Sequence, residues 1–245
     1  MDDLPIMPAM IRSLSEDVTE SLREAILRGL LKPEQHLREE QIANALKVSR
    51  VPVRSALMQL EHEGLVIARR NRGYIVARLS REDLEEVYAL RLALERLAVQ
   101  YAIHKATDQD FEAMAEVVRA FEDTANREIS EREAADLDIK YHDLLYQAAH
   151  HKQLLKHWQT LRAQTYIFLL SRNVASPGFR ELMINSHAIL LAALRDRDEV
   201  RAVALIEEHM RWAYVRIVEG YDVPNASTPE PTELIPILNP KPQRR

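Results

Sequence analysis

The 245-residue chain contains no cysteine, which excludes disulfide bonds and metal sites built from thiolates. Its 5 glycines and 4 phenylalanines are few for this length, and both shortages favour helix over sheet. No run approaches the roughly 20 apolar residues that a membrane-spanning helix needs. No basic segment followed by an apolar one marks a secretory signal at the N-terminal end. We therefore expect a mainly helical, cytoplasmic protein without membrane contact, long enough for two domains.

The net charge of −5 excludes a protein that is basic throughout, but the charge is unevenly distributed. Between Lys47 and Arg78 there are seven lysines or arginines against two acidic residues. Local charge, rather than the total, governs attraction to a polyanion. This segment therefore predicts a partner such as double-stranded DNA.

The pattern over residues 36–76 is that of two short helices followed by two apolar strands that a basic turn joins. The second helix carries aliphatic side chains such as Val53 and Leu57 on one face. Its other face carries Arg50 and Arg54, which are neighbours because they lie four residues apart. A helix with an aliphatic inner face and an arginine-rich start suits insertion into the DNA major groove.

The N-terminal part is predicted to be a winged helix-turn-helix over residues 13–78, with three helices and a two-stranded wing. A first helix is expected at 14–30, because Ser13 and Glu16 have the spacing of a capping box. Ser49 is placed to cap the third helix through its hydroxyl. Residues 1–12 show no pattern, and we expect a mobile arm there.

Residues 81–220 predict an all-helical antiparallel bundle, because helical periodicity continues with almost no glycine or proline apart from Pro177 and Gly178. The six expected helices lie at 81–105, 108–127, 130–149, 151–172, 178–196 and 198–219. The proline-rich residues 221–245 are expected to be a disordered tail.

The run VSRVPVRSALMQLEHEGLV at residues 48–66 resembles the DNA-binding domain of the GntR family of bacterial transcription regulators, and the wing segment RRNRGYIV fits the same family. The helical part resembles the FCD ligand-binding domain of the FadR branch. Its six helices are similar to the VanR-type subgroup. The resemblance implies a homodimer that binds a pseudo-palindromic operator.

The resemblance also implies which residues contact DNA. The arginines and the serine would contact phosphates and bases, and the glycine would let the wing backbone approach the minor groove. Glu40 stands where many members have a contacting arginine, so that contact is not carried over. The alternative is that these arginines form a solvated surface. The candidates are Arg38, Ser49, Arg50, Arg54, Arg72 and Gly73.

A second set of residues predicts a metal site in the bundle. Asp138 and His142 lie four residues apart, so that carboxylate and imidazole share one helix face. His187 and His209 each lie on the apolar side of a helix. Three imidazoles and one carboxylate suit a divalent transition metal, and the set is similar to the metal site of metal-binding FCD domains. We expect zinc, and nickel, manganese or iron would also fit. Core histidines with one hydrogen bond each are the alternative.

Arg91 is a candidate for binding a small organic acid effector near the metal. Its alternative role is an ion pair with Glu95, one helical turn away. We expect a repressor rather than an enzyme. A small carboxylate metabolite is expected to modulate its binding to the operator. Two alternatives stay open. One is a metal-dependent hydrolase or lyase at the same four residues, although the sequence places no separate general base beside them. The other is a metal that only stabilises the bundle.

Overall fold

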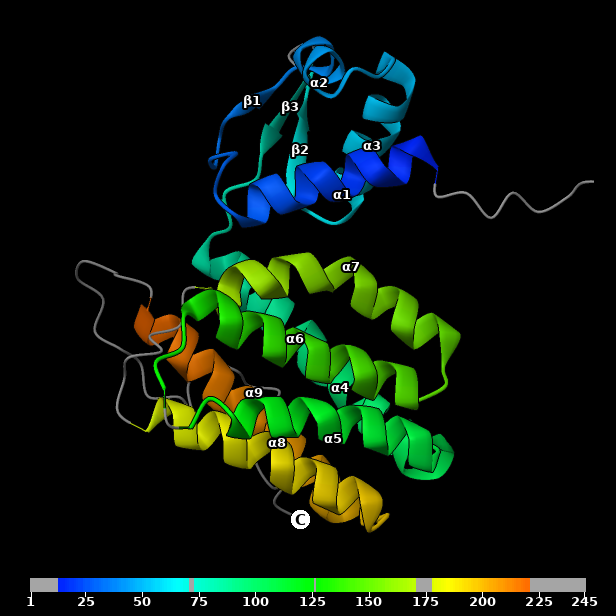
Figure 1. The fold of residues 1–245 in the computed structure, drawn as a ribbon, viewed down its shortest axis with the longest axis vertical. Coiled ribbons are helices and arrows are strands. Elements are labelled where there is room, and N and C mark those ends of the chain that lie inside the picture. The colour runs from blue at the N-terminus through cyan, green and yellow to red at the C-terminus, as the bar shows by residue number, and fades with distance from the viewer. Residues whose placement is uncertain (1–12, 71–72, 126, 171–177, 221–245) are drawn as a thin grey trace, which may run out of the picture. The chain divides into compact units, whose positions relative to one another are not determined.

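The computed structural model describes residues 13–70, 73–125, 127–170 and 178–220 (Figure 1). These residues form two compact units that divide between Arg78 and Leu79. The predicted arm at 1–12, the predicted tail at 221–245 and the candidate Arg72 lie outside the described residues. None of the described helices combines the length and apolarity that a membrane span requires.

The first unit contains helices and a small sheet. They are α1 (Leu14–Leu27), β1 (His36–Leu37), α2 (Glu39–Leu46), α3 (Arg50–His62), β2 (Val66–Arg69) and β3 (Gly73–Val76). Helices α1 and α2 both pack against α3. The inner face of α3 is fully buried through Val53, Ala56, Leu57 and Leu60, as its apolar periodicity predicts. This arrangement is the predicted winged helix-turn-helix.

The sheet has one strand more than the predicted two-stranded wing. Its strands are antiparallel in the order β1-β3-β2, with His36 of β1 opposite Ile75 of β3. A strand of two residues is too short for an alternating pattern, so the sequence alone could not reveal it. Leu37 of β1 is nevertheless buried, which fixes the segment before α2 to the wing.

Two helix ends in the first unit differ from the prediction. Helix α1 begins with the expected capping box of Ser13 and Glu16, but it ends at Leu27 rather than at residue 30. The cause is Gly29, whose positive φ of 69° turns the chain so that the N–H of Leu30 donates back to the carbonyl of Ala25.

The start of α3 corrects a second detail. Ser49 occupies the N-cap position, but its side chain makes no capping hydrogen bond. The prediction that its hydroxyl caps the helix was therefore wrong, and Ser49 is exposed at the start of α3.

The second unit contains the six predicted helices within its described residues. They are α4 (Arg81–Lys105), α5 (Asp108–Glu122), α6 (Glu131–Ala148), α7 (Lys152–Leu169), α8 (Phe179–Arg195) and α9 (Glu199–Gly220). Helix α5 ends at Glu122 rather than at residue 127. Just after this end, the hydroxyl of Thr124 donates to the carbonyl of Phe121. Helix α4 packs against α6, α7, α8 and α9, and α5 packs against α6 and α8 (Figure 1).

Among the described residues, the charged and imidazole side chains buried in this bundle gather at one place. Six charged or imidazole side chains are buried there, although such groups are costly to remove from water unless they are paired. They come from four different helices, α4, α6, α8 and α9. They are Arg91, Glu95, Asp138, His142, His187 and His209.

Candidate metal centre and nucleic-acid interface

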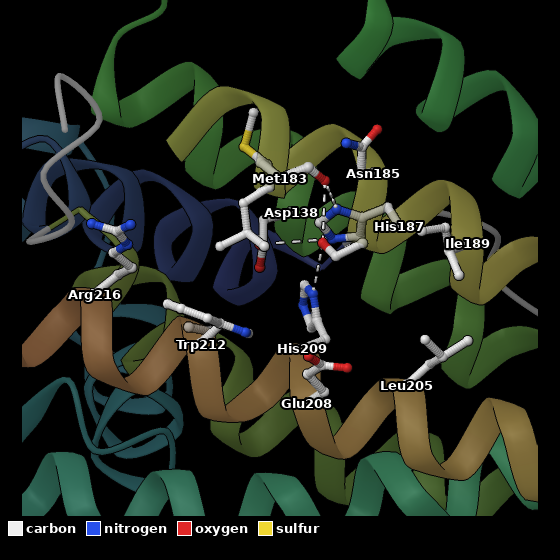
Figure 2. Close-up of a pocket in the computed structure, with 13 residues that line it drawn as sticks. Asp138, Met183, Asn185, His187, Ile189, Leu205, Glu208, His209, Trp212 and Arg216 are labelled. Atoms are coloured by element: carbon white, nitrogen blue, oxygen red, sulfur yellow. Dashed lines mark hydrogen bonds and ion pairs between the residues drawn. The ribbon is translucent and has the colours of Figure 1, made fainter. Parts of the chain in front are cut away.

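The structure brings together the four residues that the sequence predicts as metal ligands. Asp138 and His142 lie on α6, His187 on α8 and His209 on α9, and all four are buried. One possible ligand atom of each residue lies within 4.8 Å of the others. Figure 2 shows the side chains of Asp138, His187 and His209 directed toward one another.

The imidazoles face this centre through the same ring nitrogen. Nε2 of His142 lies 3.2 Å from Nε2 of His209 and 3.8 Å from Oδ2 of Asp138. Nε2 of His187 lies 3.9 Å from Oδ1 of Asp138. Three Nε2 atoms and a carboxylate therefore converge from three helices.

The remaining nitrogens of two of these rings are held by groups on α8. Nδ1 of His187 lies 2.6 Å from the carbonyl oxygen of Met183. Because a carbonyl can only accept, this Nδ1 carries the proton and Nε2 keeps its lone pair in the neutral ring. Nδ1 of His209 lies 3.1 Å from Oγ of Ser186. Such contacts orient imidazoles that bind metals.

Glu95 holds the third ring and is a residue of this site that the sequence analysis missed. It is fully buried on α4, and its Oε1 lies 2.8 Å from Nδ1 of His142. Burial would raise the pKa of Glu95, but the neighbouring His142 and Arg91 hold it below its ordinary value. The sequence analysis placed no general base beside the four residues, and Glu95, the carboxylate found there, is paired with Arg91 and His142. In the sequence, the one indication of a role for Glu95 was its position four residues after Arg91, and that spacing is equally typical of an ion pair on the protein surface.

Arg91 makes the ion pair with Glu95 that was its alternative interpretation. Its Nε donates to Oε1 of Glu95 over 3.1 Å, and the pair is buried. A terminal nitrogen of the same guanidinium lies 3.8 Å from Oδ2 of Asp138. Arg91 therefore also borders the centre, where one guanidinium faces two carboxylates.

His209 is uncharged in this environment. Burial, and then the neighbouring His187 and His142, lower its pKa well below 6.5. A neutral imidazole offers a lone pair to a cation. Imidazole nitrogens and a carboxylate are the donor set that a divalent transition metal requires, so these residues fit such an ion.

A cavity of about 170 Å³ opens onto the centre between α8 and α9 (Figure 2). Asp138, His187 and His209 form part of its wall. The rest of the wall includes Trp212 and Arg216 of α9. A molecule of limited size therefore has room beside the imidazoles.

The predicted DNA contacts on α3 lie on its exposed face. Arg54 donates from Nε and one terminal nitrogen to the two carboxylate oxygens of Glu39, over 3.0 and 2.9 Å. This hydrogen bonding raises the pKa of Arg54 and lowers that of Glu39. Arg50 lies 3.2 Å from Oε1 of Glu40. Both arginines are thus paired with carboxylates of α2.

Two further candidates are exposed at the starts of α2 and β3. Arg38 is exposed at the N-cap of α2 and makes no capping hydrogen bond. Gly73 has a φ of 74°, and a Cβ there would lie 3.3 Å from the carbonyl oxygen of Leu37. The fold therefore needs glycine at this position whether or not DNA is bound.

Comparison with known proteins gives the family. The model for bacterial regulatory proteins of the gntR family matches residues 14–76, and the FCD domain model matches residues 86–211. The chain belongs to the GntR family. The Nta operon transcriptional regulator of Aminobacter aminovorans is 30% identical over 188 residues, which are 77% of this chain and 87% of that protein.

Further relatives of this GntR-family chain agree. The HTH-type transcriptional repressor GlaR of Escherichia coli is 29% identical over 198 residues, covering 77% of this chain and 89% of that protein. The solved structure of E. coli McbR/YncC shares the fold, with a TM-score of 0.71 and 22% identity over 86% of this chain and 100% of that chain. The chain is a DNA-binding transcription regulator with an FCD domain, and the predicted family and fold class are confirmed.

The FCD match also separates two groups of residues in this GntR-family regulator. The four converging residues and Glu95 all lie within the matched range, 86–211. Trp212 and Arg216 lie beyond its end, although they form part of the same cavity wall. The sequence analysis missed both cavity residues, because only the fold shows that α9 continues along the cavity.

Proposed function

We propose that this regulator is a homodimeric repressor whose binding to a pseudo-palindromic operator is modulated by a small carboxylate, bound at a divalent metal in the FCD domain. One observation carries the proposal. Three Nε2 atoms and the Asp138 carboxylate converge at a buried centre. Zinc is the expected ion, and nickel, manganese or iron would suit the same donors.

The charges around the centre support both the metal and the class of effector. When the imidazoles bind a metal they are neutral. The carboxylates of Glu95 and Asp138 then exceed the Arg91 guanidinium by one negative charge, and all three side chains are buried. A divalent cation would turn this into one positive charge, which an anionic ligand would then balance. The bound cation would act as a Lewis acid toward a carboxylate oxygen. His142, His187, His209 and Asp138 would hold it, and Glu95 would orient His142.

The exposed face of α3 supports the role in DNA binding. Arg50 and Arg54 are exposed at the start of the helix that a winged helix-turn-helix inserts into the major groove. We propose that these arginines, with Arg38, Ser49 and Gly73, contact the operator. A single helix-turn-helix reads only a short half-site, which argues for two copies on a pseudo-palindrome. GlaR, a relative described as a repressor, supports repression as the outcome.

The test begins with the metal content of the purified chain, measured by mass spectrometry without added metal. An operator is selected from a random duplex library, and binding is followed by fluorescence anisotropy with metal-loaded and chelator-treated protein, each with a panel of organic acids. The proposal expects bound metal, and a change in operator affinity by an acid that disappears when the metal is removed. Absence of bound metal would refute it. Unchanged DNA binding with every acid, together with a lower melting temperature after chelation, would assign the metal a purely structural role.

A further inference from the structure

The cavity between α8 and α9 has walls of unequal charge. Of its thirteen lining residues, Arg216 is the one lysine or arginine, and Glu208 is the one acidic residue besides Asp138. In Figure 2, Trp212 lies between Arg216 and His209, and Glu208 lies on another side of His209. The cavity therefore has a cationic side and an anionic side, and the imidazoles lie between them.

The two charges do not cancel each other. Glu208 and Arg216 are eight residues apart on α9, which is about 12 Å along a helix axis. Glu208 is exposed and forms no ion pair among the described residues. Arg91 is buried beside Asp138 and does not line the cavity. Within the cavity wall, a ligand at the imidazoles therefore meets a positive charge along the side formed by Trp212 and Arg216.

Apolar surface lies along the cavity wall that leads to Arg216. Trp212 is 43% exposed, although large apolar side chains are usually covered. Trp212 and Arg216 are one helical turn apart, so they share a face of α9. A short carbon chain could lie against the indole and end at the guanidinium.

The size of the cavity suits a short ligand. At about 170 Å³ it is slightly larger than an engineered protein cavity of about 150 Å³ that accommodates benzene. A ligand with a backbone of about four to six carbons is therefore appropriate.

We infer that the effector is a dicarboxylate, with one carboxylate at the imidazole centre and the second at Arg216, and that Arg216 determines this specificity. The inference rests on the proposed function, because it needs an acid bound at that centre. It concerns residues beyond the end of the FCD match. Arginine suits this role because its planar fork matches the two oxygens of a carboxylate.

The experiment compares dicarboxylates with monocarboxylates of equal carbon number, using the full-length chain loaded with Zn²⁺. Succinate is paired with butyrate, glutarate with valerate and adipate with hexanoate, and each dissociation constant is measured by calorimetry. The best dicarboxylate should bind about tenfold more tightly than its partner, as a charge-assisted hydrogen bond predicts. Arg216→Gln should remove this preference by lowering dicarboxylate affinity to about that of the monocarboxylate, and Arg216→Lys should restore part of it.

Arg211→Gln is the matched control, because Arg211 is exposed on the same helix and does not line the cavity. It should keep the full preference. Equal binding of both members of each pair, or a preference that persists in Arg216→Gln, would overturn the inference. If monocarboxylates bind only in the presence of Zn²⁺, the proposed function stands in either case. If no acid of either class binds the loaded protein, both the inference and the proposed function fail.

Discussion

Replacing Glu95 by glutamine should destabilise the second unit and weaken metal binding at the same time. Glu95 is fully buried and contacts both the Arg91 guanidinium, at 3.1 Å, and Nδ1 of His142, at 2.8 Å. Glutamine has nearly the same shape but no charge. The substitution therefore removes one partner of a buried ion pair while leaving the packing nearly unchanged.

The magnitude follows from what Arg91 loses. Breaking a buried ion pair by removing one partner costs about 3–5 kcal/mol. Asp138 lies 3.8 Å from the same guanidinium and the amide oxygen can still accept, so we expect the lower end, about 3 kcal/mol. For a protein of this size such a loss lowers the melting temperature by about 10 °C. Loss of the carboxylate that orients His142 should weaken metal affinity by about 10- to 100-fold.

Urea unfolding of chelator-treated protein measures the first effect, and competition with a chromophoric zinc chelator measures the second. Glu86→Gln is the matched control, because Glu86 is exposed on the same helix. In an Arg91→Met background, Glu95→Gln should cost much less than in the native chain, since no buried guanidinium then loses its partner. A loss below 1 kcal/mol with unchanged zinc affinity, or an equal loss in both backgrounds, would refute this reasoning.

Three further predictions concern the two sites. His187→Ala should abolish bound metal, as measured by mass spectrometry, and a chelator should then no longer lower the melting temperature. His157→Ala, at an exposed histidine, should keep the bound metal and the effect of the chelator. Arg54→Ala should lower operator affinity by about 1–3 kcal/mol and reduce the dependence of log affinity on log salt by about one; an unchanged salt slope would contradict a phosphate contact. Glu40→Gln should release Arg50 and strengthen binding to a random-sequence duplex by at most about fivefold, because exposed pairs contribute up to about 1 kcal/mol. If Arg50→Ala does not remove this gain, the effect comes from general repulsion and the reasoning about the pair is wrong.

Patterns within single helices made much of the fold predictable. The buried face of α3 follows from the spacing of Val53, Leu57 and Leu60, and the start of α1 follows from the capping box of Ser13 and Glu16. Each of these signals depends on residues within one or two helical turns, which a sequence displays directly. The six helices of the bundle were predictable for the same reason.

Features that depend on residues far apart in the chain were not predictable. Strand β1 exists because β3, some forty residues later, supplies its hydrogen bonds. The pairing of Arg54 with Glu39 joins two helices, and neither residue alone indicates it. Glu95 shows the same limit, because a charged residue in mid-helix indicates a surface unless the opposing helix is known.

The four converging residues were an exception, since they were predicted although they come from three helices. Asp138 and His142 show their shared face by spacing, but His187 and His209 were connected with them only through resemblance to a known family. The lowered pKa of His209, and the groups that hold the outer nitrogens of the three histidines, depend on how the neighbouring helices pack around them.

Helix α4 links the chemistry of the centre to the DNA-binding unit along the chain. It carries Arg91 and Glu95 and begins at Arg81, shortly after β3 ends at Val76. Glu95 lies fourteen residues into this helix, which is about 21 Å of continuous hydrogen-bonded backbone from Arg81. A ligand that altered the balance between Arg91, Glu95 and His142 would therefore act directly on the element that follows the wing. Of the described helices, α4 alone both contributes to the centre and adjoins the first unit in sequence.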